Sequence, residues 1–249
     1  HSNLRDVVGK MKNVGEEFSS LLFPIGIPLN LNETSFNEDK IYTDSERYRI
    51  SAEFSRRYGK GSSIKFENGG GLFLPAGSGV TVINEHHTHL QATSADDVIN
   101  LFNYSQMLTP LFFSLGANSG ITNGKRLSNL EHQIRIFEEC EGFFDGKEGV
   151  PRVGLFPGYI QTLDDYFNVA LSFRPLYAPK DGSSSEAFEL MLGTYYGWTR
   201  IRHGSEPTPH LRIEFRPIST QPTLVENVAL AEYFVKSLLF ANSQRIPRL

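Results

Sequence analysis

One glutamate and two histidines alternate along a short segment of this chain, and these residue types can bind a metal ion or a charged substrate. The run 80–91 begins with alternating residues that predict a β-strand, and it contains Glu85, His87 and His89. Side chains two positions apart on a strand face the same side. A carboxylate and two imidazoles are costly to bury without partners. The pattern therefore indicates a metal ion or a charged ligand, the alternative being a solvated, hydrogen-bonded cluster.

A second alternating segment, 210–216, carries Arg212, Glu214 and Arg216 on one predicted strand face and apolar residues on the other. The apolar face is suited to packing against helices. The charged face can hold phosphate, carboxylate and metal together, because guanidinium groups form paired hydrogen bonds to such oxygens. The alternative is a half-exposed strand whose surface charges neutralise one another.

A third segment places Trp198, Arg200 and Arg202 on one face of a predicted strand. An arginine there could hold a substrate carboxylate, although a plain surface strand would look the same. Asn118 and Ser119 belong to a turn that offers polar side chains and backbone N–H groups. A simple helix-terminating turn is the alternative reading of that segment.

Composition and charge narrow the classes of protein to which the chain can belong. Its 249 residues, 39% of them hydrophobic, are enough for one large domain. The net charge of −4 gives no basic excess, so we expect no nucleic-acid binding. The single cysteine cannot form an internal disulfide, which favours a reducing, cytoplasmic compartment. No apolar run approaches the ~20 residues that cross a membrane, so we expect no membrane partner.

Helical and strand patterns do not alternate strictly along the chain, which predicts an α+β fold rather than a doubly wound sheet. Ser94 with Asp97 resembles a helix-capping pair, Asp44 is a plausible N-cap, and Pro110 is expected to kink or split its helix. The expected helices are 4–22, 44–58, 98–115, 128–140, 163–172, 185–193 and 222–240. The expected strands are 64–67, 72–75, 80–91, 198–202 and 210–216.

The order of these motifs resembles the second glutamate–cysteine ligase family, ATP-dependent carboxylate–amine ligases of the glutamine synthetase superfamily. The resemblance includes a Glu-Arg-Tyr helix, a His-x-His strand, a turn after a long helix, and strands of Trp-x-x-Arg and Ile-Glu-x-Arg type. Each motif is short, and their shared order over roughly residues 4–240 carries the comparison. The segments involved are 44–48, 87–89, 94–97, 115–124, 198–202 and 213–216.

The resemblance implies a glutamine synthetase-like catalytic domain with a curved, mainly antiparallel sheet covered by helices. ATP would phosphorylate a substrate carboxylate, and an amine would attack the acyl phosphate to give an amide. Mg²⁺ would assist, with Mn²⁺ as a possible substitute. Mg²⁺ prefers oxygen ligands, so the two histidines by themselves would indicate Mn²⁺ or Zn²⁺. Amino-acid carboxylate and amine substrates are the implied partners, together with self-association into a homo-oligomer.

The same resemblance implies roles for individual residues. Arg216 would meet the transferring phosphate, and Arg202 would hold the substrate or phosphate. The turn and the helix after it would contribute substrate contacts from Asn118, Ser119 and Arg135. The expected metal set comprises Glu214, His87, His89 and Glu85.

The chain also departs from the family pattern. We expect a single catalytic-type domain over residues 1–249 that lacks the family's N-terminal Glu-x-Glu strand. Gly120 replaces the usual proline of the turn, and Ser219 lies near the position of an expected acidic residue. Two alternatives therefore stay open. One is a non-catalytic, ligase-like binding protein or subunit, and the other is a hydrolase that uses His87 and His89 to bind zinc.

Overall fold

The computed structural model describes residues 25–36, 46–142, 150–173, 184–205 and 207–244, together with isolated positions outside these ranges. Asp44 and all but isolated positions of the helix predicted at 4–22 lie outside the described residues. The described part has an α+β fold with mainly antiparallel strand pairing, as the sequence predicted. None of the sheets formed by these residues closes into a barrel.

A three-stranded antiparallel sheet forms the centre of the fold, in the order β3 (Glu85–Gln91), β9 (His210–Ser219) and β8 (Thr199–Gly204). The pairing of β3 with β9 shifts register between His86 and Thr88, where β9 has one extra residue. Pro217 lies in this irregular stretch. Proline has no N–H to donate to a partner strand, and a bulge accommodates that loss.

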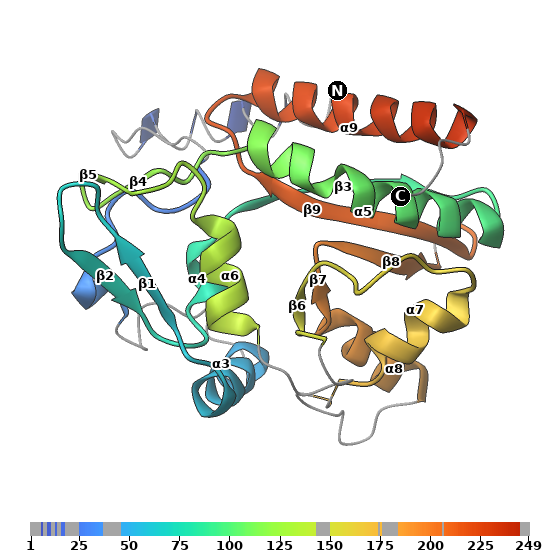
Figure 1. The fold of residues 1–249 in the computed structure, drawn as a ribbon, viewed down its shortest axis with the longest axis horizontal. Helices are drawn as coiled ribbons and strands as arrows, with labels where there is room; N and C mark the ends of the chain where they lie inside the picture. Colours follow the sequence, from blue (N-terminus) through green and yellow to red (C-terminus); the bar gives the residue numbers. More distant parts are fainter. Residues whose placement is uncertain are drawn as a thin grey trace.

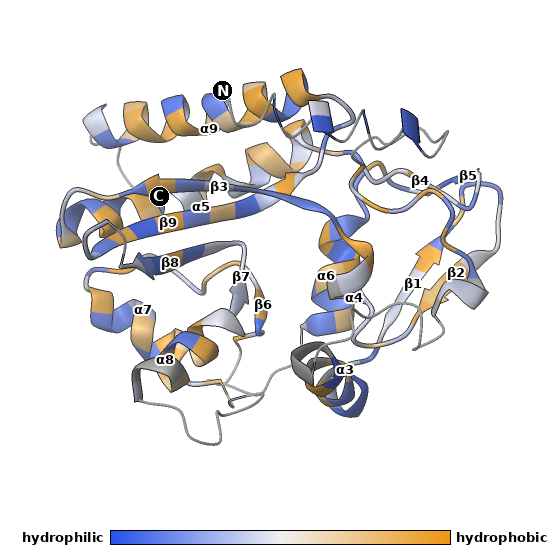
Figure 2. Cartoon of the chain, turned by 180° about the vertical axis from the view of Figure 1, so that it is seen from behind, coloured by the Kyte–Doolittle hydropathy of each residue, from blue (hydrophilic) through white to orange (hydrophobic). Residues whose placement is uncertain are grey.

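Two long helices cover one face of this sheet, α5 (Ala95–Leu115) and α9 (Leu224–Gln244) (Figure 1). Figure 2 shows hydrophobic and hydrophilic residues alternating along α9, as expected for a helix with one buried side. The apolar residues of β9 pack beneath the helices, and the ring of Phe215 stacks on that of Phe234. The predicted division of β9 into an apolar and a charged face is therefore confirmed.

The start of α5 follows the capping pattern expected from the sequence. The Ser94 hydroxyl accepts a hydrogen bond from the Asp97 amide at 3.1 Å, and the Asp97 carboxylate accepts one from the Thr93 amide at 2.8 Å. Pro110 lies inside the helix, which continues to Leu115. The helix is therefore not divided in two at the proline.

The remaining elements form two groups beside the other face of the sheet (Figure 1). One group contains β6 (Val153–Gly154), β7 (Tyr196–Gly197), α7 (Leu163–Ala170) and α8 (Ser184–Gly193), and β6 and β7 form a short parallel pair. The other group comprises η1 (Glu33–Phe36), α3 (Glu46–Tyr58), β1 (Ser62–Lys65), β2 (Gly71–Leu74), α4 (Gly79–Val82), β4 (Ile121–Thr122), β5 (Lys125–Arg126) and α6 (Gln133–Glu141).

The expected start of the histidine-bearing strand is wrong. Residues 79–82 form the short helix α4, and β3 begins only at Glu85. The Val82 amide donates to the Ser78 carbonyl at 3.2 Å, and the Thr81 hydroxyl donates to the same carbonyl at 2.7 Å. This helical turn buries Val82 in the core shared by β1, β2 and α6. The alternating apolar residues of this segment therefore belong to a single helical turn and not to a strand.

No helix in the part of the chain that the structure describes combines the length and apolar character needed to span a membrane.

Candidate active site

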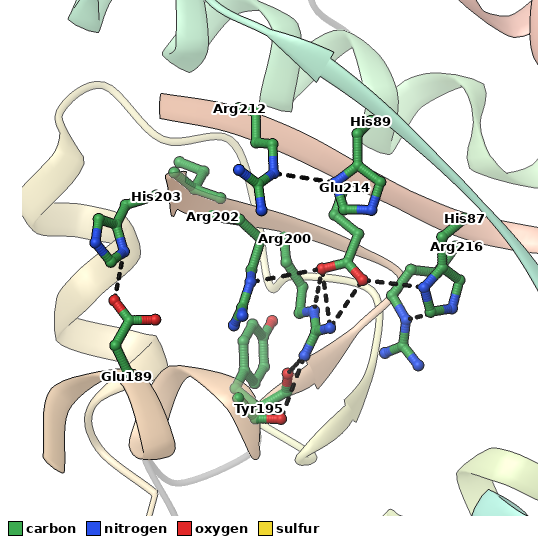
Figure 3. A network of polar contacts seen from close by, with 12 residues as sticks. His87, His89, Glu189, Tyr195, Arg200, Arg202, His203, Arg212, Glu214 and Arg216 are labelled. Atoms are coloured by element: carbon green, nitrogen blue, oxygen red, sulfur yellow. Dashed lines mark hydrogen bonds and ion pairs between the residues drawn. The ribbon is translucent and has the colours of Figure 1, made fainter. Parts of the chain in front are cut away.

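A cluster of charged side chains lies on the sheet face opposite α5 and α9, with Glu214 at its centre (Figure 3). Strand register explains the arrangement, because Glu214 of β9 pairs with His89 of β3 on one side and with Arg200 of β8 on the other. Arg212 is likewise flanked by Gln91 and Arg202. Three strands therefore each contribute residues to one face.

The Glu214 carboxylate is held by a two-pronged hydrogen bond from Arg200. The Arg200 Nε donates to Oε2 at 3.1 Å and its Nη2 donates to Oε1 at 2.9 Å. The Nε of Arg202 lies 3.8 Å from Oε2. Burial would raise the pKa of Glu214, but the hydrogen bond from His87 and the charge of Arg200 outweigh it and hold the pKa well below its usual range.

His87 lies between two carboxylates. Its Nε2 is 2.8 Å from Glu85 Oε2, and its Nδ1 is 3.2 Å from Glu214 Oε1. Burial would lower the pKa of His87, yet its hydrogen bonds to Glu214 and Glu85 raise the pKa above the usual value. Glu85 in turn accepts a hydrogen bond from Arg216 Nη2 at 2.7 Å. His87 thus joins the Glu214–Arg200 pair to the Glu85–Arg216 pair.

His89 completes a set of groups that could hold a metal ion. One donor atom each from His87, His89 and Glu214 lies within 4.8 Å of the others. His89 Nδ1 accepts a hydrogen bond from Arg212 Nε at 3.2 Å, and burial lowers the pKa of His89. Two imidazoles and one carboxylate are a donor set that suits Mn²⁺ or Zn²⁺ better than Mg²⁺.

Two of the arginines have hydrogen-bond donors left over. Arg202 Nη1 and Arg216 Nη1 are buried, and neither has a hydrogen-bond partner among the described residues. Buried N–H groups without acceptors are costly, and an anion would satisfy them. The cluster can therefore bind an oxyanion in addition to any cation.

The other predicted site residues lie outside this cluster. The Asn118 side chain donates to the Thr220 carbonyl at 2.8 Å. The Ser119 hydroxyl accepts from the amides of His132 and Gln133, at the start of α6. Arg135 forms a 2.6 Å ion pair with Glu139 on the exposed side of α6. The contacts of Asn118 and Ser119 join different segments of the fold, and the ion pair of Arg135 lies within α6. None of these contacts involves Glu214.

Arg200 was not among the site residues that the sequence predicted, although it is the main partner of Glu214. The sequence did indicate its position, because Arg200 lies two residues before Arg202 and therefore on the same face of the strand. The Tyr195 carbonyl also supports the site by accepting from Arg200 Nη1 at 2.9 Å. A backbone carbonyl leaves no such signal in the sequence.

A cavity of about 650 Å³ lies at the end of the sheet beyond Arg212. It is lined by the turn from Gln91 to Ala95 and by His203 and His210. Gln91 is also the register partner of Arg212, so the cavity lies next to that end of the sheet, and no residue of the charged cluster is among its lining residues. A volume of this size is typical of a small-molecule site.

A sequence model described as Glutamate-cysteine ligase family 2 (GCS2) matches residues 28–239 of the chain. The matched region contains all the residues of the charged cluster, from Glu85 to Arg216. No curated protein matches the chain.

Proposed function

Because this chain belongs to glutamate–cysteine ligase family 2, a family of carboxylate–amine ligases, we propose that it forms an amide in an ATP-dependent reaction. The γ-phosphoryl group of ATP passes to a carboxylate oxygen and ADP leaves. The amine then attacks the acyl carbon, phosphate departs with the electrons of the broken C–O bond, and the amine nitrogen loses a proton. The carboxylate and the amine both come from small molecules of amino-acid type.

The observation that carries this proposal is the convergence of guanidinium groups on one sheet face. A carboxylate and a polyphosphate repel each other, so a site that brings them together must supply positive charge. Arg216 and Arg202 each have a buried, unpaired N–H, and we assign them to the transferring phosphoryl group and to the substrate oxygens. Fixed donors of this kind favour a transition state whose charge is spread over phosphoryl oxygens.

The family resemblance implies a divalent cation, which would neutralise phosphate charge during transfer. We assign its protein ligands to Glu214, His87 and His89, with Glu85 next to them. These residues by themselves do not fit Mg²⁺, because two of the three grouped donors are imidazole nitrogens. Mn²⁺ accepts imidazole ligands more readily, so we propose Mn²⁺ for this donor set. Mg²⁺, the ion that the resemblance implies, would have to take further ligands from phosphate oxygens.

We retain Asn118, Ser119 and Arg135 as proposed substrate contacts. Asn118 bonds to Thr220, and the preceding residue, Ser219, is the register partner of Glu85. The turn that carries Asn118 and Ser119 therefore lies toward the Glu85 end of the cluster. This position suits recognition of a part of the substrate that does not react.

The test is ADP formation by the full-length protein with a panel of amino-acid carboxylates and amines. We expect ADP only when a suitable carboxylate is present, and a rate about 100-fold lower or more in Glu214→Gln. Glu232→Gln is the matched control, because Glu232 is paired with Lys236 on the exposed surface of α9. Folded full-length protein that forms no ADP with any pair would contradict the proposal and favour a non-catalytic, ligase-like binding protein.

A further inference from the structure

The charged cluster carries more positive than negative charge before any ligand binds. Its members within the described residues are four guanidinium groups and two carboxylates, which leaves an excess of two positive charges before the histidines are considered. Arginine stays protonated at every physiological pH, so this excess does not depend on titration. The members are Arg200, Arg202, Arg212, Arg216, Glu85 and Glu214. Glu189, a further carboxylate whose charge acts on Arg202, is paired with His203.

The two carboxylates of the cluster are already engaged. Both oxygens of Glu214 accept hydrogen bonds from Arg200, and His87 contacts one of them. The Oε2 of Glu85 accepts from Arg216 and contacts His87, which leaves Glu85 Oε1 as the carboxylate oxygen without a donor. Mg²⁺ takes about six ligands and prefers oxygen. A positively charged site with one unengaged oxygen is therefore unfavourable for binding a divalent cation in the absence of an anion.

The same cluster is well prepared for an anion. The side chain of Arg216 is only 7% exposed and is fixed by its bond to Glu85, and its Nη1 has no acceptor among the described residues. Arg202 presents a second enclosed and unpaired N–H on the neighbouring strand. A phosphate chain has several oxygens and could satisfy both donors while cancelling the excess charge.

We propose that this site binds the phosphate chain of its nucleotide in the absence of any divalent cation, and that the cation binds only together with that chain. The inference rests on the proposed function, because it concerns the same site. Phosphate oxygens would reverse the local charge and supply oxygen ligands beyond those that the described residues of the cluster offer. By thermodynamic linkage, the anion must then strengthen cation binding by the same factor as the cation strengthens anion binding.

The experiment is calorimetric titration of the full-length protein with inorganic tripolyphosphate in EDTA, with Mg²⁺ or Mn²⁺ alone, and with the cation after saturation by tripolyphosphate. We expect tripolyphosphate to bind in EDTA. We expect the cation to bind at least about 10-fold more tightly after the anion than alone, a coupling within the usual range. Cation binding without the anion, with tripolyphosphate bound only in the presence of the cation, would overturn the inference.

Variants connect the binding to this cluster. Arg216→Gln and Arg202→Gln should each weaken tripolyphosphate binding at least about 10-fold, because each removes a charge-assisted donor. Arg126→Gln, at an arginine side chain that is 75% exposed on β5, should bind like the wild type. Arg202 is less buried than Arg216, so Arg202→Gln provides the test if the other variant does not fold. Unchanged binding in a folded Arg202→Gln protein would overturn the inference.

Assays of ADP formation on the same preparation separate this inference from the proposed function. If the cation binds without tripolyphosphate, tripolyphosphate binds only in the presence of the cation, and the protein forms ADP, the inference is overturned and the ligase proposal stands. Tripolyphosphate binding in EDTA without ADP formation from any substrate pair would support the inference and contradict the ligase proposal.

Discussion

The Glu214 carboxylate is the residue on which the charged cluster depends, because partners from all three strands of the sheet contact or flank it. Its side chain is 5% exposed, and its paired hydrogen bonds with Arg200 replace the water that it loses on folding. A buried carboxylate without such partners would take up a proton rather than remain charged. Arg200 therefore keeps Glu214 ionised and fixes its orientation.

Replacing Arg200 by Met should lower the free energy of unfolding by about 3 kcal/mol, because breaking a buried ion pair leaves the other charge uncompensated. Glu214→Met should also be destabilising. The double variant should lose clearly less than the sum of the two single losses, since it removes both charges. Urea unfolding measures the free energy of unfolding of the two single variants and the double variant, and Arg126→Met is the control at an exposed arginine. Additive losses would show that Arg200 and Glu214 do not act as a pair.

Cys140 provides a prediction about reactivity and pH. The side chain is fully buried, and burial raises the pKa of its thiol to about 12. Because the thiolate is the reactive form, the native protein at pH 8 should react with a thiol reagent far more slowly than the unfolded chain. The raised pKa stabilises the fold fully below about pH 9, and this contribution is lost as the pH rises from about 9 toward about 12. Equal labelling rates for native and unfolded protein would contradict this prediction.

At the residue scale, alternation within single strands was sufficient to predict the charged face. It placed Arg212, Glu214 and Arg216 on one side of a strand, and the structure confirms that arrangement. What alternation could not provide is which residue contacts which, because pairing depends on register between distant segments. The sequence placed Arg200 on the same strand face as Arg202 but did not assign it to Glu214, because that pairing depends on the register of β8 with β9.

At the scale of elements, most of the expected helices and strands are observed, including the short helices α7 and α8, and the clear error falls on one brief apolar alternation. The 21-residue helix α5 combines a cap, an acidic first turn and an apolar side, and these signals agree with one another. Residues 79–82 offered only a brief apolar alternation, which a helical turn and a strand satisfy equally well. In the structure the segment forms a helical turn, in which the Ser78 carbonyl accepts hydrogen bonds from the Val82 amide and the Thr81 hydroxyl.

The cap of α5 can be tested directly. Ser94→Ala removes the hydroxyl that accepts from the Asp97 amide and should cost about 1 kcal/mol of stability. For a domain of this size the melting temperature should fall by about 2–4 °C. Ser114→Ala is a matched control, because Ser114 lies on the exposed side of the same helix and alanine favours helix. An equal loss in both variants would show that the cap contributes nothing specific.

At the scale of the whole molecule, the described residues form two main apolar cores. One lies between the central sheet and α5, α9 and α7, and the other lies between the β1–β2 hairpin and α6. A small third cluster of Phe137, Val153 and Trp198 lies between elements of both groups. Sequence patterns predicted most of the individual helices and strands. Their assembly into cores could not be read from local patterns, because it depends on contacts such as β3 with β9 that join distant segments.

The third cluster allows a test of the expectation that residues 1–249 form one cooperative domain. Trp198 is the single tryptophan of the chain and is fully buried. Its ring packs edge-on against Phe113 of α5 and Phe137 of α6, and its Nε1 donates to Glu138 at 3.0 Å. Tryptophan fluorescence therefore reports on the junction between the cores, whereas far-UV circular dichroism reports on all helices.

If the two cores unfold together, the fluorescence and circular dichroism transitions in urea should have the same midpoint. Phe137→Ala should shift both midpoints to lower urea together, because the cavity beside Trp198 weakens the junction, at a cost of about 3 kcal/mol or more. Phe73→Ala is the matched control, since Phe73 is 57% exposed on β2 and its loss should change stability little. A fluorescence transition that precedes the circular dichroism transition would mean that the junction opens first and that the cores are separate folding units. The charged cluster would then be tested best by variants in the central sheet, because Glu85, Glu214 and their arginine partners all come from β3, β9 and β8.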